Sequence, residues 1–516
     1  MSSGSCGALV GVDVGTSAVK VLAVTPAGQV VASATGSYPL DTPRPGWVEQ
    51  DAEAICSSAL KALRDVLRTI SENGSHVAAI GFSSAMHGLL PVDAAGRARG
   101  PLVTWMDRRA AEVAQRWRED GTGEALYART GAPLHPMLPS CKLRWFAEQD
   151  PAHIANAAKF VSMKELIVFR LTGEWLIDWG LASATGLFDI HTRVWSDVAL
   201  AAVQIDAGKL SAAVAPSTTL VAPRTTLAAD IGLPHGTALV LGSSDGALAN
   251  LGTGAVRPGD VAVTLGTSGA VRSVVARAIL DEHGRTFCYA YDDTKYIVGG
   301  PTSSAGGVLD KLQELFLGEV PRHERFARAL DLAQRAEPGA GGLTVMPFLS
   351  GERAPYWLAA LRGGIVGLDL THTRGDVMRA AFESVVFALA SVFGVLSERI
   401  GETTEIRLSG GLSHAPFVRQ LVADIFARRA VVPDQPEASA FGAATFAGIS
   451  AGLLANERAA AALLEPLYVH EPDAGATANY AQIFARYRDV VDAYLPLYSD
   501  ALATNATTIR ARSKPR

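Results

Sequence analysis

Cysteine is scarce in this chain: there are four among 516 residues, and no two form a CxxC pair. We therefore expect reduced, mostly buried thiols, as in a cytosolic protein. The formal net charge is −5 and no basic stripe stands out, which argues against a nucleic-acid or anionic-membrane surface. The N-terminus, MSSGSCG, has no basic segment, so no signal peptide is expected.

Apolar runs of membrane-spanning length are also missing. The longest one with a helical pattern, 384–396, is shorter than the ~20 residues that cross a bilayer, and Glu383 and Glu398 flank it. We expect a buried core helix there. Two nucleotide-binding motifs are absent as well, because no GxxxxGK[ST] occurs and no GxGxxG follows a strand. The sequence therefore supports neither a P-loop fold nor a Rossmann cofactor site.

The residues that are present suit a large globular α/β protein. A length of 516 and a hydrophobic content of 48% allow about two large domains or three ordinary ones. Apolar residues at helical spacing predict helices, with Asp51 as the cap of the first, over 51–70, 303–316, 376–400 and 416–426. The Pro-rich segment 131–143 is expected to be a loop.

Two distant stretches share one plan: an apolar strand, a short glycine-hydroxyl loop and a second strand. Their loops are DVGTS at 13–17 and LGTSG at 265–269, and a third loop, SGG at 409–411, also follows a strand. Such a repeat predicts two domains of one design rather than a solenoid. Backbone N–H groups and hydroxyls there can hold phosphate oxygens, and Asp13 can hold hydrated Mg²⁺. A nucleoside triphosphate would then bind between domains, although each loop alone also fits a plain hairpin.

A single carboxylate, Asp245, lies in the stretch LGSSDGALAN at 241–250, directly after an apolar strand. We expect a short, flexible loop there. Such a loop can hold a catalytic base in a cleft, but the dipeptide DG is also a common turn signal. Its position between the two hydroxyl loops favours the functional interpretation.

Two segments carry polar side chains of interest, and the second of them suits a polyhydroxylated ligand. The first, 83–88, contains Met86 and His87, and the second, VTWMDRR at 103–109, groups an indole with an acceptor and donors. An aromatic ring can cover C–H faces while charged groups pair with hydroxyls. The alternatives are a structural histidine and a surface ion-pair cluster.

The motifs together resemble the FGGY carbohydrate kinases, which belong to the actin/hexokinase/heat-shock-chaperone ATPase superfamily. The resemblance covers about 9–454, and its most specific part is the C-terminal signature. The matching segments are GWVEQD at 46–51, GERAPYW at 351–357, Gly410-Gly411, Gln420, Ala423-Asp424, Glu437-Ala438-Ser439-Ala440 and Gly442-Ala443-Ala444. This implies an α/β protein with two ribonuclease H-like (actin-like ATPase) domains and a central cleft. The implied parts are a sugar-binding and phosphate domain at 1–247, a nucleotide-binding domain at 248–495 and a polar tail at 496–516.

Within the family the chain most resembles the gluconokinases, through SSAMHGL at 83–89, TWMDRR at 104–109, LHPM at 134–137 and ASATGLFD at 182–189. That resemblance implies phosphorylation of a terminal hydroxyl of a sugar acid, D-gluconate to 6-phospho-D-gluconate, with ATP and Mg²⁺ in the cytoplasm. The implied partner is a small sugar acid or polyol, with no nucleic acid and no membrane, and a homodimer is left open. The alternatives are a xylulokinase-like kinase of a ketopentose or polyol, and a non-catalytic ATP-driven switch.

The resemblance also assigns roles to the matching residues. Asp245 matches the general base, and it is expected at the metal together with Asp13. The implied nucleotide-binding residues are Asp13, Gly15, Thr16, Ser17, Lys20, Gly266, Thr267, Ser268, Gly306, Gly410 and Gly411. The implied substrate-binding residues are Met86, His87, Trp105, Asp107, Arg108 and Asp245. A substrate carboxylate needs a cation, for which the candidates are Arg108, Arg109 and Lys142, with His87 or His135 in support. Ala415 stands where some relatives carry an asparagine near the adenine.

Overall fold

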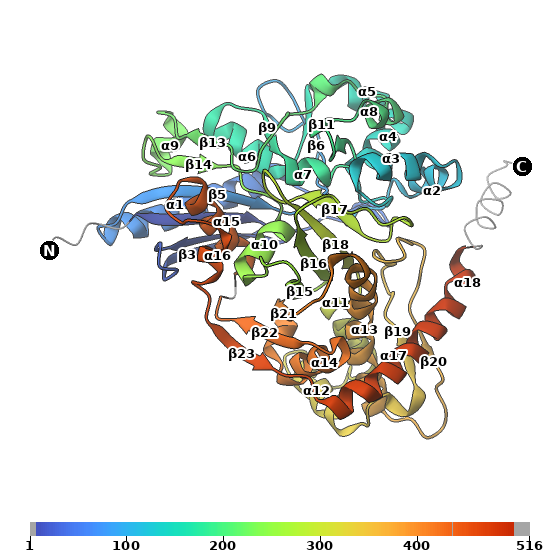
Figure 1. Ribbon diagram of the computed structural model, residues 1–516. Coiled ribbons are helices and arrows are strands. Elements are labelled where there is room, and N and C mark those ends of the chain that lie inside the picture. Colours follow the sequence, from blue (N-terminus) through green and yellow to red (C-terminus); the bar gives the residue numbers. More distant parts are fainter. Residues whose placement is uncertain (1–6, 436, 500–516) are drawn as a thin grey trace, which may run out of the picture. The chain divides into compact units, whose positions relative to one another are not determined.

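The computed structural model describes residues 7–435 and 437–499, which divide into two compact units (Figure 1). Unit 1 contains the described residues up to Asp260, together with Arg272–Val298 and Pro433–Glu465. Unit 2 contains Val261–Val271, Gly299–Val432 and the described residues from Pro466 onward. Each unit is therefore assembled from separated stretches of the chain.

The sheet of unit 1 has six strands in the order β13-β14-β5-β1-β2-β3. The strands are β1 (Ala8–Val14), β2 (Ala18–Val24), β3 (Val30–Ser37), β5 (Val77–Ser84), β13 (Thr219–Val221) and β14 (Ala238–Val240). The first three form an antiparallel meander, as the sequence predicts, whereas β5 runs parallel to both β1 and β14. The carboxyl ends of β1, β5 and β14 therefore lie at one edge of the sheet.

Side chains of β1 alternate between two hydrophobic layers. Val10 and Val12 pack into the layer that contains α1 (Ala52–Glu72), whose cap is Asp51 as expected. Leu9 packs into the layer that contains α15 (Ala438–Ser450). Strict alternation of this kind is what a strand buried on both faces requires.

Helix α15 lies unusually close to the sheet and to α10 (Asp245–Thr253). A Cβ on Gly11 of β1 would come within 1.9 Å of the Ala440 carbonyl oxygen, and one on Gly81 of β5 within 2.2 Å of the Ala443 oxygen. The small residues of α15 therefore permit close backbone approach to the sheet.

The rest of unit 1 is mostly an insertion between β5 and β13. Strand β4 (Glu49–Gln50) precedes the insertion. The strands of the insertion are β6 (Leu90–Val92), β7 (Leu102–Val103), β8 (Lys159–Val161), β9 (Leu176–Asp178), β10 (Phe188–Asp189), β11 (Val194–Trp195) and β12 (Ala212–Val214). Its helices are α2 (Ala111–Glu119), α3 (Thr122–Thr130), α4 (Pro139–Gln149), α5 (Pro151–Asn156), α6 (Met163–Thr172), α7 (Trp179–Ser183), α8 (Asp197–Val203) and η1 (Ala207–Lys209). Unit 1 also contains α9 (Thr226–Asp230), β17 (Phe287–Ala290) and α16 (Glu457–Ala461).

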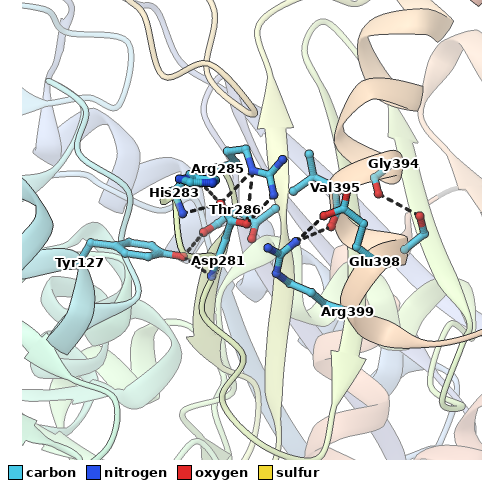
Figure 2. Close-up of polar contacts among 10 residues, drawn as sticks. Tyr127, Asp281, His283, Arg285, Thr286, Gly394, Val395, Glu398 and Arg399 are labelled. Atoms are coloured by element: carbon cyan, nitrogen blue, oxygen red, sulfur yellow. Dashed lines mark hydrogen bonds and ion pairs between the residues drawn. The ribbon is translucent and has the colours of Figure 1, made fainter. Parts of the chain in front are cut away.

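The loop before β17 is anchored to α3 (Figure 2). The Tyr127 hydroxyl donates to the Thr286 carbonyl at 2.8 Å and accepts from the Asp281 backbone N–H at 2.9 Å. The Asp281 carboxylate in turn accepts from the Arg285 side chain, with the shortest distance at 2.8 Å. This loop therefore has a fixed attachment to the insertion.

In unit 2, four strands follow the order β15-β21-β22-β23, and β15, β21 and β22 are parallel. Their bounds are β15 (Val261–Leu265), β21 (Glu405–Ser409), β22 (Arg429–Pro433) and β23 (Pro466–His470). Two further strands, β16 (Gly269–Val275) and β18 (Tyr296–Thr302), pass along the chain from one unit into the other. The remaining elements are α11 (Gly306–Phe316), α12 (Arg325–Arg335), η2 (Ala340–Gly342), β19 (Thr344–Met346), β20 (Gly364–Val366), α13 (Arg374–Ile400), η3 (Gly411–His414), α14 (Pro416–Phe426), α17 (Ala474–Tyr494) and α18 (Pro496–Ser499).

Helix α13 is the one described helix that is long and apolar enough to cross a bilayer by length and composition. Most of it is buried inside the protein, which agrees with the predicted core helix.

Two local expectations are wrong. Asp245 does not lie in a flexible loop but is the first residue of α10, and Ser244 is its cap. The segment 131–143 is not a loop throughout, because α4 begins at Pro139. Proline fits the first turn of a helix, where its missing N–H has no partner to lose.

Candidate active site

Asp245 lies at the carboxyl edge of the unit 1 sheet. Strand β14 ends at Val240, and a bridge pairs Ser244 with Ser84 at the end of β5. The Ser244 hydroxyl caps α10 by accepting from the Ala247 N–H at 3.3 Å. The Asp245 carboxylate accepts from the Gly246 N–H at 2.7 Å. A carboxylate at a helix N-terminus is stabilised in its charged form.

Asp13 lies at the same edge, near the end of β1. It pairs in register with Ser83 of β5, whose hydroxyl donates to its carboxylate at 2.6 Å. Burial and then the charge of Asp245 raise the pKa of Asp13 to about 7, against the opposing effects of Ser83 and Lys20. The two acids, Asp13 on β1 and Asp245 at the start of α10, lie at the same edge of the sheet and therefore repel each other electrostatically.

The two acids fit a hard cation. Among residues 7–435 and 437–499, no cluster of three or more His, Cys, Asp or Glu side chains could hold a metal ion. Mg²⁺ is commonly bound by one or two carboxylates, with water and substrate phosphates as its other ligands. Asp13 and Asp245 supply two such carboxylates, and a cation between them would offset their repulsion.

The loop after β1 is held by several side chains. Gly15 closes the hairpin by donating to the Ala18 carbonyl at 3.0 Å, and its own carbonyl accepts from the Tyr38 hydroxyl at 2.7 Å. The Thr16 hydroxyl accepts from the Trp105 indole N–H at 2.9 Å. This bond joins the expected phosphate loop to the expected sugar loop. Lys20 forms an ion pair of 2.7 Å with Glu437, and Ser17 is exposed.

Met86, Trp105 and Thr16 line one small cavity of unit 1, together with Gly15, Ala85 and Thr104. The structure thus brings the two expected sugar loops together. His87 faces elsewhere: it is 9% exposed, and its Nδ1 lies 2.7 Å from the Ala184 carbonyl oxygen. The contact fixes the ring, and the backbone at His87 has a φ of 65°.

Asp107 holds the second sugar loop. Its carboxylate accepts from the Val48 N–H at 2.7 Å, the Arg109 N–H at 2.9 Å and two Arg109 side-chain nitrogens at 2.9 and 2.8 Å. A carboxylate has about four acceptor positions, so these four donors fill it. Arg109 also pairs with Glu49 and stacks on Trp47. The ion-pair cluster expected at the surface is therefore buried, whereas Arg108 is exposed.

Lys142 is fully buried on α4 and donates to three backbone carbonyls. The distances are 2.7 Å to His87, 3.3 Å to Val103 and 2.7 Å to Thr104. An ammonium group has three donors, so all three are used within the protein. Burial lowers the pKa of Lys142 to about 7. The structure does not present Lys142 or Arg109 as a cation for a substrate carboxylate.

Sequence reasoning missed two charged residues near Asp245. Arg272 on β16 is buried, its Nε lies 3.3 Å from the Asn250 amide oxygen, and the Asp245 charge opposes the lowering of its pKa by burial. Lys164 on α6 forms a buried ion pair of 2.7 Å with Asp178 and donates to the Ser243 carbonyl at 2.9 Å. A charged residue inside an apolar strand was the available signal for Arg272.

In unit 2, three glycine-containing segments converge. The hairpin after β15 accepts two bonds from the start of α11: Gly306 N–H to Gly266 at 2.9 Å, and Gly307 N–H to Thr267 at 3.0 Å. These two N–H groups therefore hold the start of α11 against the hairpin. A Cβ on Gly410 would come within 2.6 Å of Leu265, so only glycine permits this approach. Thr267 and Gly411 are exposed beside this junction, and Ser268 is partly exposed.

The fold and these sites define a phosphotransferase of the two-domain actin-like ATPase class. Residues 8–252 match the N-terminal domain, and residues 261–451 the C-terminal domain, of the FGGY family of carbohydrate kinases. The chain belongs to this family, whose members transfer phosphate to an alcohol acceptor.

Three comparisons show how similar the chain is to known kinases of this family. The chain is 34% identical to a gluconokinase of Bacillus subtilis (strain 168) over 479 residues, covering 92% of this chain and 93% of the relative. A crystal structure of gluconate kinase from Lactobacillus acidophilus matches with a TM-score of 0.91 and 30% identity, over 96% of this chain and all of the other. A ligand-bound xylulose kinase from the same species matches with a TM-score of 0.90 and 30% identity, over 96% and 99% of the two chains.

Proposed function

We propose that this protein phosphorylates the terminal hydroxyl of D-gluconate with ATP and Mg²⁺, giving 6-phospho-D-gluconate in the cytoplasm. The observation that carries the proposal is the placement of Asp245 beside Asp13 at the strand ends of unit 1, next to the two sugar loops. The sequence identity of 34% to a gluconokinase supports the choice of acceptor.

Asp245 would act as the general base. A sugar hydroxyl has a pKa far above neutrality, and a positioned base contributes roughly 10²–10⁴ in rate. The proton of the acceptor hydroxyl passes to the Asp245 carboxylate as the hydroxyl oxygen bonds to the γ-phosphorus, and the bond from that phosphorus to the ADP oxygen breaks. Mg²⁺, held by Asp13 and Asp245, would supply positive charge to the phosphate oxygens.

The other residues bind and orient. The Met86 and Trp105 side chains line the cavity where the sugar chain would lie, and Thr16 links that cavity to the phosphate loop. In unit 2, the segments around Gly266, Ser268 and Gly410 would hold the nucleotide. Most of the remaining barrier is lowered by positioning and by charges directed at the phosphoryl group.

A coupled assay of ADP release over gluconate, xylulose, ribulose and glycerol tests the proposal. We expect the highest kcat/KM with gluconate, and a product whose phosphorus resonance is split by the two protons of C6. ADP release at full rate without any acceptor would instead favour an ATP-driven switch that does not transfer phosphate to a sugar. Xylulose as the best acceptor would favour the ketopentose alternative, which the similarity to the xylulose kinase structure supports.

Arg108 is exposed, and we propose it as the cation that binds the gluconate carboxylate. Replacing Arg108 with alanine should raise the KM for gluconate by about tenfold, the loss expected for one exposed charge-assisted contact of about 1.4 kcal/mol. The KM for an uncharged acceptor should not change. Arg108→Lys is the matched control that keeps the charge, and an unchanged gluconate KM in Arg108→Ala would exclude this residue.

A further inference from the structure

Two buried lysines of unit 1 each hold a different functional loop by its backbone. Lys142 contacts carbonyls of the two sugar loops, whereas Lys164 contacts the Ser243 carbonyl, two residues before Asp245. The exposed fractions of these lysines are 0% and 2%. An ammonium group is expensive to bury unless hydrogen bonds and charges compensate it.

Lys142 joins loops that are far apart in sequence. The Val103 carbonyl accepts both from Lys142 and from the Leu89 N–H at 3.0 Å, so the loops 83–89 and 103–109 are already neighbours. The bond from Lys142 to His87 falls at the residue with positive φ, which follows Met86 directly. The bond to Thr104 falls directly before Trp105. One ammonium therefore fixes the backbone on which both cavity-lining side chains are mounted.

Lys164 instead binds the backbone between β14 and α10. Its ammonium is shared between the Ser243 carbonyl and Asp178, which is itself fully buried and caps α7 by accepting from the Leu181 N–H at 3.0 Å. Ser243 precedes the cap residue Ser244, so this bond fixes the backbone at the start of α10. Asp245 is the first residue of that helix.

We propose that Lys142 and Lys164 are separate positioning residues, Lys142 for the acceptor-binding loops and Lys164 for the base-bearing helix start. This assignment rests on the proposed function for its kinetic consequences. Neither lysine touches the acceptor in this scheme. Each acts through a carbonyl, so loss of Lys142 should impair acceptor binding, whereas loss of Lys164 should impair the chemical step.

The kinetic test compares Lys142→Met and Lys164→Met, which keep most of the side-chain volume and remove the donors. Lys142→Met should raise the acceptor KM by about tenfold or more with kcat within about threefold. Lys164→Met should lower kcat by about 10²-fold with the acceptor KM within about threefold, since a displacement of ~1 Å can have that effect. Equal losses in both parameters for both variants, or no loss in either, would overturn the proposal.

Lys209→Met is the matched control. Its ammonium also donates to two backbone carbonyls of unit 1, Ile154 at 2.8 Å and Ala157 at 2.7 Å, but these belong to α5 and the residue after it. We expect normal KM and kcat in this variant. A KM increase equal to that of Lys142→Met would show that any lysine-to-carbonyl bond in unit 1 has this effect and would refute the specific role.

Hydrogen exchange measured by mass spectrometry supplies a readout that needs no substrate. Lys142→Met should speed exchange in peptides covering 83–89 and 102–109, and Lys164→Met in peptides covering 241–247. Unchanged exchange there would overturn the inference, even if the wild-type protein phosphorylates gluconate. Conversely, these exchange patterns without any kinase activity would refute the proposed function and keep the anchoring. If Lys142→Met does not fold, Lys142→Gln, whose amide still offers donors, should show the same exchange pattern at smaller amplitude.

Discussion

Gly442 of α15 determines how closely the helix that carries Asp245 can pack. A Cβ at this position would lie 1.9 Å from the Leu248 carbonyl oxygen of α10, and 3.0 Å is a distance below which real Cβ atoms essentially never come. Replacing Gly442 with alanine must therefore move the two helices apart by at least the difference, 3.0 − 1.9 = 1.1 Å. The obstacle is backbone, so no side chain can rotate away.

The displacement predicts two separate effects. Overpacking of a tight contact destabilises a protein by about 1–3 kcal/mol, so the melting temperature of Gly442→Ala should fall by several degrees. Asp245 is the first residue of α10, and a shift of ~1 Å at a reacting group can lower the rate by about 10²-fold. We therefore expect kcat to fall about 10²-fold while the KM for ATP stays within about threefold. Scanning calorimetry and steady-state kinetics below the melting range measure the two effects.

Gly394→Ala provides the control. Gly394 lies within helix α13 (Figure 2). It is exposed, and a Cβ there would meet nothing within 4 Å. Alanine at such a helical position should stabilise the protein by about 0.4–1 kcal/mol and leave kcat unchanged. A Gly442→Ala enzyme with the melting temperature and kcat of the wild type would refute the argument that this contact positions Asp245.

Two further predictions concern single carboxylates. Asp245→Asn should lower kcat by about 10²–10⁴-fold, the usual contribution of a general base, while calorimetric titration still detects acceptor and nucleotide binding; near-normal turnover would remove Asp245 from this role. Burial raises the pKa of Glu165 to about 7 from its ordinary value near 4.5. Between these two pH values the folded protein therefore retains a proton that the unfolded chain releases. The resulting contribution to stability is complete below about pH 4.5 and is lost as the pH rises to about 7. The glutamine of Glu165→Gln can still cap α6. In denaturant titrations, the free energy of unfolding of this variant should therefore rise relative to that of the wild type by up to about 3 kcal/mol as the pH increases from about 4.5 to about 7. A difference in unfolding free energy that does not depend on pH would contradict this pKa.

The sequence predicted elements well where one periodic pattern extended over many residues. The α1 helix and its Asp51 cap, the hairpin at 13–17 and the long buried helix α13 were all recognisable, because alternation and helical spacing are local properties. The glycine-hydroxyl loops were recognisable for the same reason. The loops at 265–269 and 409–411 converge within unit 2 because β15 and β21 are neighbours in the sheet, and a single sequence does not reveal this strand order.

The errors arose where a residue had two local interpretations. The dipeptide at Asp245-Gly246 is a turn signal, but the cap residue Ser244 and the apolar residues after it continue as a helix. Pro139 is typical of a loop in the local sequence, although it begins α4. The arginine–aspartate cluster at 107–109 appeared to be exposed because its partners, Val48 and Glu49, are distant in sequence. In each case a tertiary contact decided between interpretations that the local sequence allowed.

The small residues of the C-terminal signature have a function that their sequence position conceals. They form α15, which belongs to unit 1 together with Asp13 and Asp245. Gly442 and Ala438 of α15 lie against the backbone of α10, and the Ser439 hydroxyl donates to the Asp245 carbonyl at 3.2 Å. A larger side chain at Gly442 would displace α10, which begins at Asp245. We infer that this part of the signature is required chiefly to place the acid at 245, so substitutions there should lower kcat more than they raise the KM for ATP.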